Sequence, residues 1–503
     1  MSDRRRAVIL WIGLALAAGA IRFLRFDHFS YWLDEILELS TVRGTWSSMW
    51  SSLRTQGLHA PLDYIVQKLW FPVAAGGSWH RALPAVWGIL CVVLLGILLA
   101  RRAGFAVAIS ASAFLALSPF HVRYSQEVRP YALGTLFLVA ALLAVDRHLE
   151  RPRLSTLLAF YFCSLGCLYS LYLAAFVLAL AAPALAIEDA VGGDPGRRAT
   201  ARRFLMWSPV HAAVIAAGFL PWLPVLMRAL RLPPMTAPPP LAPARALRYF
   251  AYFGFNPNDG YPLGRQGVFF AGLVVFGIGW AVWTPGLRFL PAWAILGLAG
   301  VELLEHGHPT YDSIFHWLPA GIALAPLAAL PVAFLVRRRG MAVFGAALAA
   351  VVVALYVRGL TRYFETGRPD WRPLARYLAA RPLATYADTG PGREQLFVEN
   401  QYTKLCLAYY LVGPGWLCCR TVEDVQVVSV DGDLAQLGKQ WRRGSDGWLV
   451  LAAGPRSPAL REWAASFPGR EFPEVELGGV LRRLQRRDGE ANPASEFPPR
   501  DRD

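Results

Sequence analysis

The chain has 503 residues, 55% of them hydrophobic and only 17% charged, and a formal net charge of +15. This composition excludes an ordinary soluble enzyme and indicates a polytopic membrane protein. The positive charge does not indicate nucleic-acid binding, because the Arg residues fall in short clusters between apolar segments, as membrane topology requires. Six Cys residues with no CxxC pair and no Cys/His metal spacing argue against a disulfide scaffold or a zinc site.

Eleven apolar segments have the length of a transmembrane helix. The first, at 7–21, follows MSDRRR and has the form of a signal sequence, but we interpret it as an uncleaved span because many spans follow. The other predicted spans are 82–100, 104–120, 131–146, 154–170, 171–187, 207–223, 267–284, 288–304, 316–336 and 341–358.

Six clusters of Arg residues predict the topology. With eleven spans they all fall on one side, which the positive-inside rule makes cytoplasmic; they are 4–6, 101–102, 147–153, 197–203, the turn ending at Arg288, and 337–339. The N-terminus is then cytoplasmic. The first loop, at 25–80, and everything after Gly359 are extracytoplasmic, and polar and ionisable residues gather on that side.

The first external loop contains an acidic pair, Asp34 and Glu35, among aromatic and apolar residues. Carboxylates are costly at a membrane boundary unless they are solvated, paired or used, so this pair is a candidate active site. The alternative is a solvated acidic turn that caps an interfacial helix. The rest of the loop is too polar to cross the bilayer and predicts amphipathic helices along the interface.

A second polar stretch, RYSQEVRPY at 123–131, lies between the third and fourth predicted spans. Pro130 suits the first turn of a helix, so Gln126, Glu127 and Arg129 would lie at its positive N-terminal end. A helix N-terminus with a neighbouring Arg is suited to bind phosphate. The alternative is an ion pair between Glu127 and Arg129 that only holds the turn.

The segment 302–316, before the tenth span, gathers three His, two Glu, one Asp and one Tyr. These residues could ligate a divalent cation or line a sugar pocket, but their spacing matches no standard metal motif.

After residue 359 the apolar runs stop. Helical patterns at 370–380, 405–411 and 457–467 alternate with strand-like VQVVSV and WLVLAA, which predicts a small extracytoplasmic α/β domain over 360–487. Residues 488–503 are polar and Pro-rich and are expected to be disordered. An oxidising compartment would permit Cys406 to pair with Cys418 or Cys419.

Four motifs in this order resemble the bacterial polytopic glycosyltransferases related to protein O-mannosyltransferases and the lipid A aminoarabinose transferase. They are LDE at 33–35, HAPLDY at 59–64, RALP at 81–84 and SQEVRPYAL at 125–133. The sequence Asp-Trp-Arg at 370–372 is also similar. The resemblance implies the GT-C fold, a donor sugar linked to polyprenyl phosphate, and transfer on the outer face of the bacterial cytoplasmic (inner) membrane.

The same resemblance implies roles for individual residues. Asp34 corresponds to the acidic residue of the family's first-loop motif and Arg129 to the Arg of its second motif. Two positions depart from the pattern: Asp63 stands where the family usually has an aromatic residue, and His316 where an Arg is more usual.

Transfer from a phosphate leaving group needs a base for the acceptor's proton and cations for the departing phosphate. We expect Asp34 to act as the base or to position the acceptor, supported by Glu35. We expect Arg129 to bind the phosphate, helped by Arg123 and by His59 or His316. Further substrate contacts are expected from Tyr64, Gln126, Glu127 and Tyr131.

The expected partners are a polyprenyl-phosphate sugar, membrane lipids, and a lipid, glycan or protein acceptor; a divalent cation is left open as a cofactor. A transporter or lipid flippase would share the span count, but it usually places ionisable residues near the membrane midplane on broken helices. A third hypothesis, an inert scaffold for the external domain, leaves the polar outer turns unexplained.

Overall fold

The computed structural model divides the chain into two compact units. Unit 1 comprises residues 1–26 and 50–367, and unit 2 comprises residues 27–49 and 368–503. The structure describes residues 3–56, 59–74, 77–231, 253–255, 265–307, 314–366, 370–385, 387, 393–399, 401–412, 426–429, 437, 447–451, 462, 464–465, 469–472 and 479–484.

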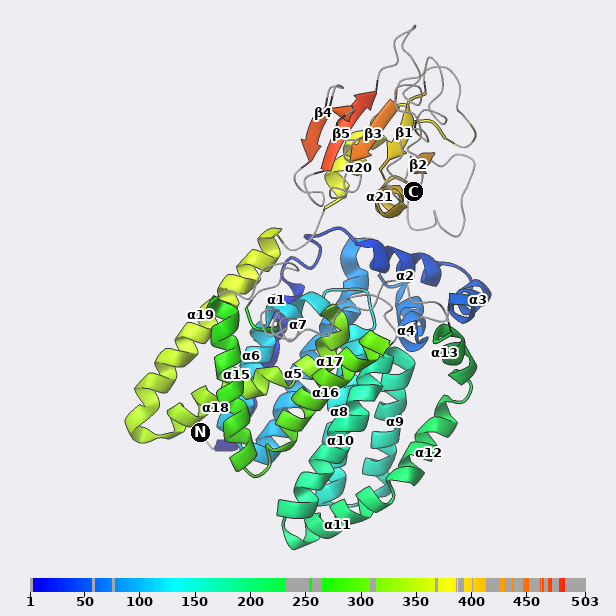
Figure 1. Ribbon diagram of the computed structural model, residues 1–503. Coiled ribbons are helices and arrows are strands. Elements are labelled where there is room, and N and C mark those ends of the chain that lie inside the picture. The colour runs from blue at the N-terminus through cyan, green and yellow to red at the C-terminus, as the bar shows by residue number, and fades with distance from the viewer. Residues whose placement is uncertain are drawn as a thin grey trace, which may run out of the picture. The chain divides into compact units, whose positions relative to one another are not determined.

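Unit 1 is helical throughout its described residues (Figure 1). Its helices are α1 (Asp3–Phe23), α4 (Leu62–Trp70), η1 (Gly77–Arg81), α5 (Ala82–Ala103), α6 (Phe105–Leu117), α7 (Pro119–Tyr124), α8 (Tyr131–Glu150), α9 (Leu154–Ser170), α10 (Tyr172–Gly192), α11 (Pro195–Met206), α12 (Ser208–Phe219), α13 (Leu223–Ala229), α15 (Arg265–Trp283), α16 (Phe289–Gly307), η2 (Ile314–Trp317), α17 (Leu318–Gly321), α18 (Leu324–Arg337), η3 (Arg339–Met341) and α19 (Ala342–Thr366). Helix α3 (Trp46–Gln56) runs across the division between the units.

The chain is a multi-pass membrane protein, because six helices among the described residues are long and apolar enough to cross a bilayer. The helices α12 and α13, bent by 87° at their junction, would make a seventh as one broken span. The remaining four predicted spans coincide with the shorter apolar helices α1, α6, α9 and α16. A helix is therefore present at each of the eleven predicted segments, and the count of eleven spans stays a prediction.

Two of the Arg clusters, 101–102 and 197–203, meet at one end of the helix bundle of unit 1. Arg102 at the end of α5 pairs with Asp146 of α8 at 3.0 Å and with Asp189 of α10 at 2.9 Å. Arg197 of α11 pairs with the same Asp146 at 2.7 Å. The side chains of Asp146 and Arg102 are buried, so each charge needs its partners there. The network also agrees with the prediction that these clusters share one side of the membrane.

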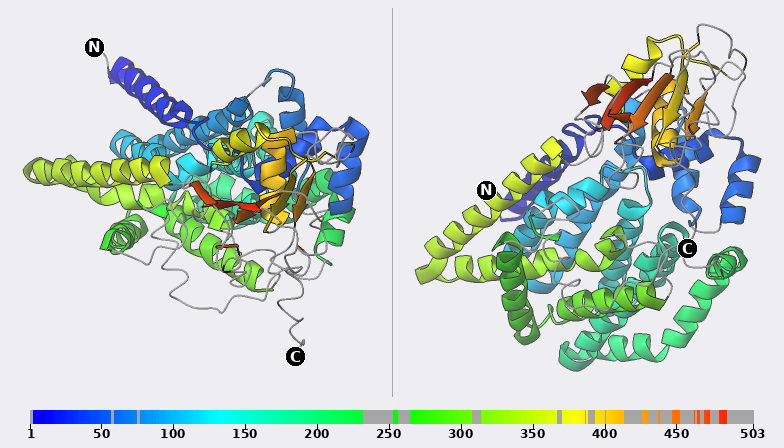
Figure 2. Two further views of the ribbon diagram at one scale, coloured as in Figure 1. Left: turned by 90° about the horizontal axis from the view of Figure 1, so that it is seen from above. Right: turned by 45° about the horizontal axis from the view of Figure 1, so that its top comes forward.

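The helices of unit 1 pack closely where small residues face a neighbour. A side chain at Gly277 of α15 would lie 1.9 Å from the backbone oxygen of Leu327 in α18, so only glycine permits this approach. Helix α10 packs against α8, α9 and α16. Helix α11 crosses the end of α10 and leads into α12, which lies along the outer side of α9 (Figure 1 and Figure 2).

Unit 2 contains a five-stranded mixed sheet in the order β2-β1-β3-β5-β4 (Figure 1). Strand β1 is parallel to β2 and β3, whereas β5 is antiparallel to β3 and β4. Both β1 and β3 are buried along their whole length, as expected for central strands. The elements are α2 (Leu33–Arg43), α20 (Arg372–Ala379), β1 (Gln395–Val398), α21 (Gln401–Val412), β2 (Val427–Ser429), β3 (Gly447–Leu451), β4 (Gly469–Phe472) and β5 (Gly479–Leu484).

Helices and strands of unit 2 coincide with several segments expected from the sequence. VQVVSV contains β2, WLVLAA contains β3, and the two expected helices contain α20 and most of α21. The expected helix at 457–467 and the expected disordered tail at 488–503 lie outside the described residues, apart from 462 and 464–465. Unit 2 also includes residues 27–49, which the sequence alone assigned to the first loop of the membrane domain.

Candidate active site

The turn before α8 presents a buried Arg at a helix N-terminus. Pro130 caps α8, which begins at Tyr131, as the sequence predicted. Arg129 is 4% exposed, and its Nη2 donates to Nε2 of His59 at 3.3 Å. Its Nε donates to the hydroxyl of Tyr131 at 3.4 Å, and the guanidinium lies 5.7 Å from that ring's centre. The positive end of α8 and the buried guanidinium together favour an anionic ligand.

His59 is neutral in this arrangement. An Arg has only donors, so Nε2 of His59 accepts the bond from Arg129 and carries no proton. Burial lowers the pKa of His59 well below its ordinary value, and the positive charge of Arg129 and the proximity of His316 lower it further. In this pair of side chains Arg129 is therefore the cation, and His59 is its neutral hydrogen-bonding neighbour.

The structure brings four of the sequence-predicted site residues together in unit 1. His316 in η2 lies close enough to His59 to influence its pKa, and the following helix α17 packs against α8 and α10. The ring of Tyr64 in α4 stacks on His59 with centroids 6.2 Å apart. Arg129, His59, His316 and Tyr64 thus form one group near the start of α8, which we call the α8 pocket.

Two other predicted residues of this turn bind protein groups. Glu127 forms an ion pair with Arg123, 3.7 Å between Nε and Oε1, and the pairing of Glu127 with Arg129 stays a prediction. The amide nitrogen of Gln126 donates to the backbone oxygen of Arg22 at 2.8 Å, and its amide oxygen accepts from the hydroxyl of Tyr363 at 3.0 Å. Gln126 therefore ties the turn to α1 and α19.

Sequence reasoning missed a buried pair beneath this turn. Arg22, at the end of α1, is fully buried, and its Nη2 lies 2.6 Å from Nδ1 of His121 in α7. Its Nη1 donates to the backbone oxygens of Ala18 and Ala116. A single Arg at the end of an apolar span was the available signal, because a buried cation must find polar partners.

The acidic pair of the first loop opens α2 in unit 2. Asp34 is half-buried in the first turn, and Glu35 is fully buried. The carboxylate of Glu35 accepts from the backbone N–H of Trp32 at 3.3 Å, which caps the helix. Glu35 therefore takes part in capping α2 from a buried and not a solvated position, and Asp34 is the more accessible acid of the pair. Glu38, one turn further, is also buried.

A metal centre finds no support within the described residues, where no group of three or more His, Cys, Asp or Glu side chains could hold an ion. Residues 308–313 of the expected His-rich turn lie outside the described part of the chain. Cys406 is buried in α21, and Cys418 and Cys419 lie outside the described residues, so their pairing stays a prediction.

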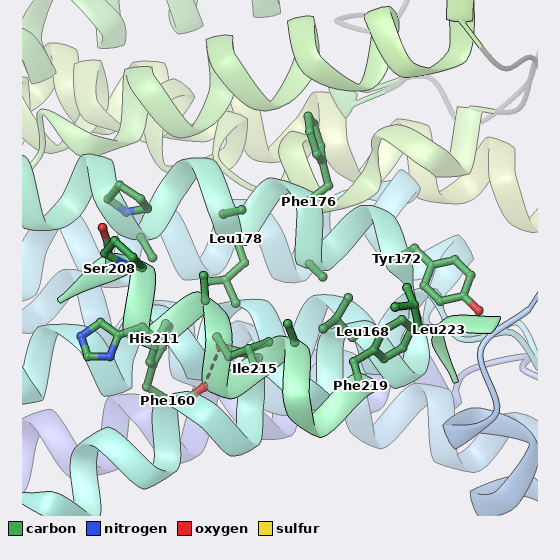
Figure 3. A pocket seen from close by; sticks show the side chains of 18 of the residues that line it. Phe160, Leu168, Tyr172, Phe176, Leu178, Ser208, His211, Ile215, Phe219 and Leu223 are labelled. Carbon is green, nitrogen blue, oxygen red and sulfur yellow. Dashed lines mark hydrogen bonds between the residues drawn. The ribbon is translucent and has the colours of Figure 1, made fainter. Parts of the chain in front are cut away.

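An apolar cavity of about 750 Å³ lies between α9, α10 and α12, with α13 at one end (Figure 3). Phe160, Leu178, Ile215 and Phe219 are among its lining residues. The hydroxyl of Ser164 donates within its own helix to the backbone oxygen of Phe160 at 2.7 Å, so it is already satisfied. A cavity of this lining suits a hydrocarbon chain.

Comparison with solved structures supports the fold, whereas comparison with known sequences finds no match. No family model matches the chain, and no curated protein matches it. The solved structure of ArnT from Cupriavidus metallidurans in the apo state is similar, with a TM-score of 0.53 and 14% identity over 96% of this chain and 98% of that one. The same protein bound to undecaprenyl phosphate gives 0.52 and 14% identity, covering 95% and 97%.

An oligosaccharyltransferase from Archaeoglobus fulgidus in the apo form is also similar, with a TM-score of 0.50 and 11% identity over 96% of this chain and 76% of that one. These neighbours are GT-C glycosyltransferases of the membrane. The chain is therefore a multi-pass membrane protein with the GT-C fold, as the sequence motifs indicated.

Proposed function

We propose that this protein is a membrane glycosyltransferase that takes a sugar from a polyprenyl-phosphate donor. The acceptor is a lipid, a glycan or a protein on the extracytoplasmic face. The observation that carries the proposal is the α8 pocket, in which buried Arg129 faces neutral His59 at a helix N-terminus. The similarity to ArnT, which was solved bound to undecaprenyl phosphate, supports a lipid phosphate as the ligand.

The proposed chemistry exchanges one bond for another at the sugar's anomeric carbon. The acceptor oxygen forms a bond to that carbon, and the bond to the donor's phosphate oxygen breaks. Asp34 takes the acceptor's proton, and the released polyprenyl phosphate keeps the electron pair. Arg129 stabilises the charge that accumulates on the departing phosphate.

The two proposed roles belong to residues of different units: Asp34, the base, lies in unit 2, and Arg129, the phosphate ligand, lies in unit 1. Asp34 is supported as the base because it is half-buried and therefore more accessible than Glu35, which is fully buried. Arg129 is supported as the phosphate ligand because it is a buried cation at the N-terminal end of α8. Gln126 and the pair Arg123–Glu127, which the sequence also proposed as ligands, make contacts that hold the turn, and their contacts to substrate stay predictions.

Supplying radiolabelled polyprenyl-phosphate sugars to membranes that contain the wild type or an Asp34→Asn variant tests the proposal. A labelled acceptor product with the wild type, strongly reduced in the variant, supports a transferase. Labelled donor that crosses the membrane unchanged would indicate a transporter or flippase and overturn the proposal.

A first prediction concerns the charge of His59. Because its pKa is lowered well below 6.5, it should be neutral between about pH 6 and 8, and donor affinity should not fall as the pH rises through this range. Gln keeps an acceptor for Arg129, so His59→Gln should change donor affinity by less than about threefold, and His59→Ala should weaken it about tenfold. Binding assays of labelled donor at several pH values measure both effects. An affinity that declines above pH 6.5 in the wild type but not in His59→Gln would contradict a neutral His59.

A second prediction concerns the apolar cavity, which we propose binds the donor's polyprenyl chain. Ala212 lines the cavity and the next residue, Ala213, does not, although both residues are exposed. Ala212→Trp should displace about two methylene groups of the chain and weaken long-chain donor binding by about 1.6 kcal/mol, or roughly fifteenfold.

Ala213→Trp is the matched control, and it should leave donor affinity within about twofold of the wild type. A short-chain donor should bind both variants alike. Equal affinities of Ala212→Trp and Ala213→Trp for the long-chain donor would exclude the cavity as the chain's binding site.

A further inference from the structure

The segment before α2 is held by an Arg from the far end of the sequence. Arg372, the first residue of α20, donates through Nη1 to the backbone oxygen of Asp27 at 2.7 Å and through Nη2 to that of His28. The same guanidinium is fixed by Asp370, with Nε 2.7 Å and Nη2 2.9 Å from its carboxylate. Since Asp27, His28 and Asp370 lie in unit 2 with Arg372, these bonds make Arg372 a clamp within one compact unit.

Two further bonds continue this clamp toward α2. The backbone N–H of Trp371 donates to the hydroxyl of Ser30 at 3.2 Å. The backbone N–H of Tyr31 donates to the hydroxyl of Tyr410 in α21, and the ring of Tyr31 meets that of Tyr409 edge to face at 5.8 Å. Ser30, Tyr31 and Trp371 are buried, so water competes little for these bonds.

These contacts act directly before the proposed base. The clamped residues 27–31 are outside any helix or strand, and α2 begins at Leu33, with Asp34 in its first turn. An irregular segment can adopt many conformations, so its place is set by what holds it. A general base must be held within fractions of an ångström of its productive position, and a misplacement of about 1 Å can cost about a hundredfold in rate.

We propose that Arg372 is a positioning residue for Asp34, acting through the segment 27–31, and that the C-terminal part of the chain thereby sets the catalytic competence of the first loop. This inference rests on the proposed function, since it assigns Asp34 as the base. It predicts that loosening the clamp slows the chemical step without weakening the binding of the donor. The proposed donor ligands, Arg129 and His59, belong to unit 1.

The test compares Arg372→Ala with Arg381→Ala in the full-length protein. Arg381 is the matched control because it also lies in unit 2, where it donates to the hydroxyl of Tyr377 at 2.8 Å and lies 5.4 Å from the ring centre of Trp448. Two quantities are measured for each variant: hydrogen–deuterium exchange in peptides covering 27–40, and kcat and KM for labelled donor.

Arg372→Ala should speed exchange in 27–40 and lower kcat by about ten- to a hundredfold, with KM for the donor within about twofold of the wild type. Arg381→Ala should leave both quantities within about twofold. Arg372→Lys should have a kcat between those of Arg372→Ala and the wild type. The guanidinium of Arg372 donates to two backbone carbonyls and to Asp370 at the same time, and a single ammonium cannot reproduce this geometry.

Unchanged exchange in Arg372→Ala would overturn the clamp. Faster exchange with unchanged kcat would overturn the positioning role. If the proposed function is wrong, the wild type will transfer no sugar, which is a separate result. The positioning role is then excluded as well. The exchange data still decide whether Arg372 holds the segment.

Discussion

Asp34→Asn is expected to lower the turnover of sugar transfer by about a hundred- to ten-thousandfold, because the substitution keeps the shape of the side chain and removes its basicity. Donor affinity should stay within about twofold of the wild type, since the acid acts on the acceptor's proton and not on the donor's phosphate. Single-turnover transfer from labelled donor and equilibrium binding of the same donor separate the two quantities. Equal losses of binding and turnover would contradict the role of Asp34 as base.

Glu35→Gln is the control that decides between the two acids. The carbonyl oxygen of Gln can accept the bond that Glu35 accepts from the N–H of Trp32, so α2 should keep its cap and turnover should fall by less than about tenfold. Glu35→Ala should remove the cap and destabilise the helix by about 1 kcal/mol. A loss in Glu35→Gln as large as that in Asp34→Asn would assign the base to Glu35.

The long apolar helices could be predicted from the sequence because a bilayer imposes their length and composition. The patterns at 82–100, 131–146 and 341–358 correspond to α5, α8 and α19. The bend of 87° between α12 and α13 was not predicted, although Pro221 and Pro224 lie at or near it. Proline weakens a helix, but the angle it adopts depends on the neighbours that pack around it.

The composition of the candidate site was predicted better than its pairings. The motifs supplied His59 and Arg129, which meet in the structure although 70 residues separate them. The ion pair of Glu127 with Arg123 was not predicted, since in a turn Glu127 can reach an Arg two residues away or one four residues away. The partners of Gln126 lie about 100 and 237 residues away, and no local pattern carries such contacts.

The sequence also could not predict that residues 27–49 of the first loop belong to unit 2 together with the C-terminal part of the chain. The composition change near residue 359 suggested a boundary, but it could not indicate that 27–49 belong with the segment after it. The contacts responsible are hydrogen bonds to backbone groups, as between Arg372 and the carbonyl of Asp27. Backbone groups are the same at every residue, so such contacts leave little trace in the amino-acid pattern.

Arg129→Ala is expected to weaken donor binding roughly thirty- to a thousandfold and to slow transfer as well. Arg129 is buried and would make a charge-assisted contact to phosphate, worth about 2–4 kcal/mol when water is largely excluded. The same charge would stabilise the departing phosphate, so both the bound donor and the transition state lose the contact. Binding and single-turnover transfer of labelled donor measure the two losses.

Arg228→Ala is the matched control, because it removes the same charge from an exposed Arg in unit 1, whose Nη1 donates to the backbone oxygen of Arg54 at 3.2 Å. It should change donor affinity by less than about twofold. Arg129→Lys should recover only part of the affinity, because a point charge cannot replace the planar fork that contacts His59 and Tyr131.

The competing account gives Arg129 only a structural role, in which it orders the turn before α8 through His59 and Tyr131. That account predicts a lower thermal stability for Arg129→Ala, with normal donor affinity in the protein that remains folded. It also predicts that His59→Ala and Arg129→Ala have equal effects and that the double variant is no worse than either, because both remove the same contact. If Arg129 binds phosphate, Arg129→Ala costs far more donor affinity than His59→Ala, because neutral His59 contributes no charge to the ligand. Normal donor binding by a folded Arg129→Ala protein would therefore remove Arg129 from the phosphate site.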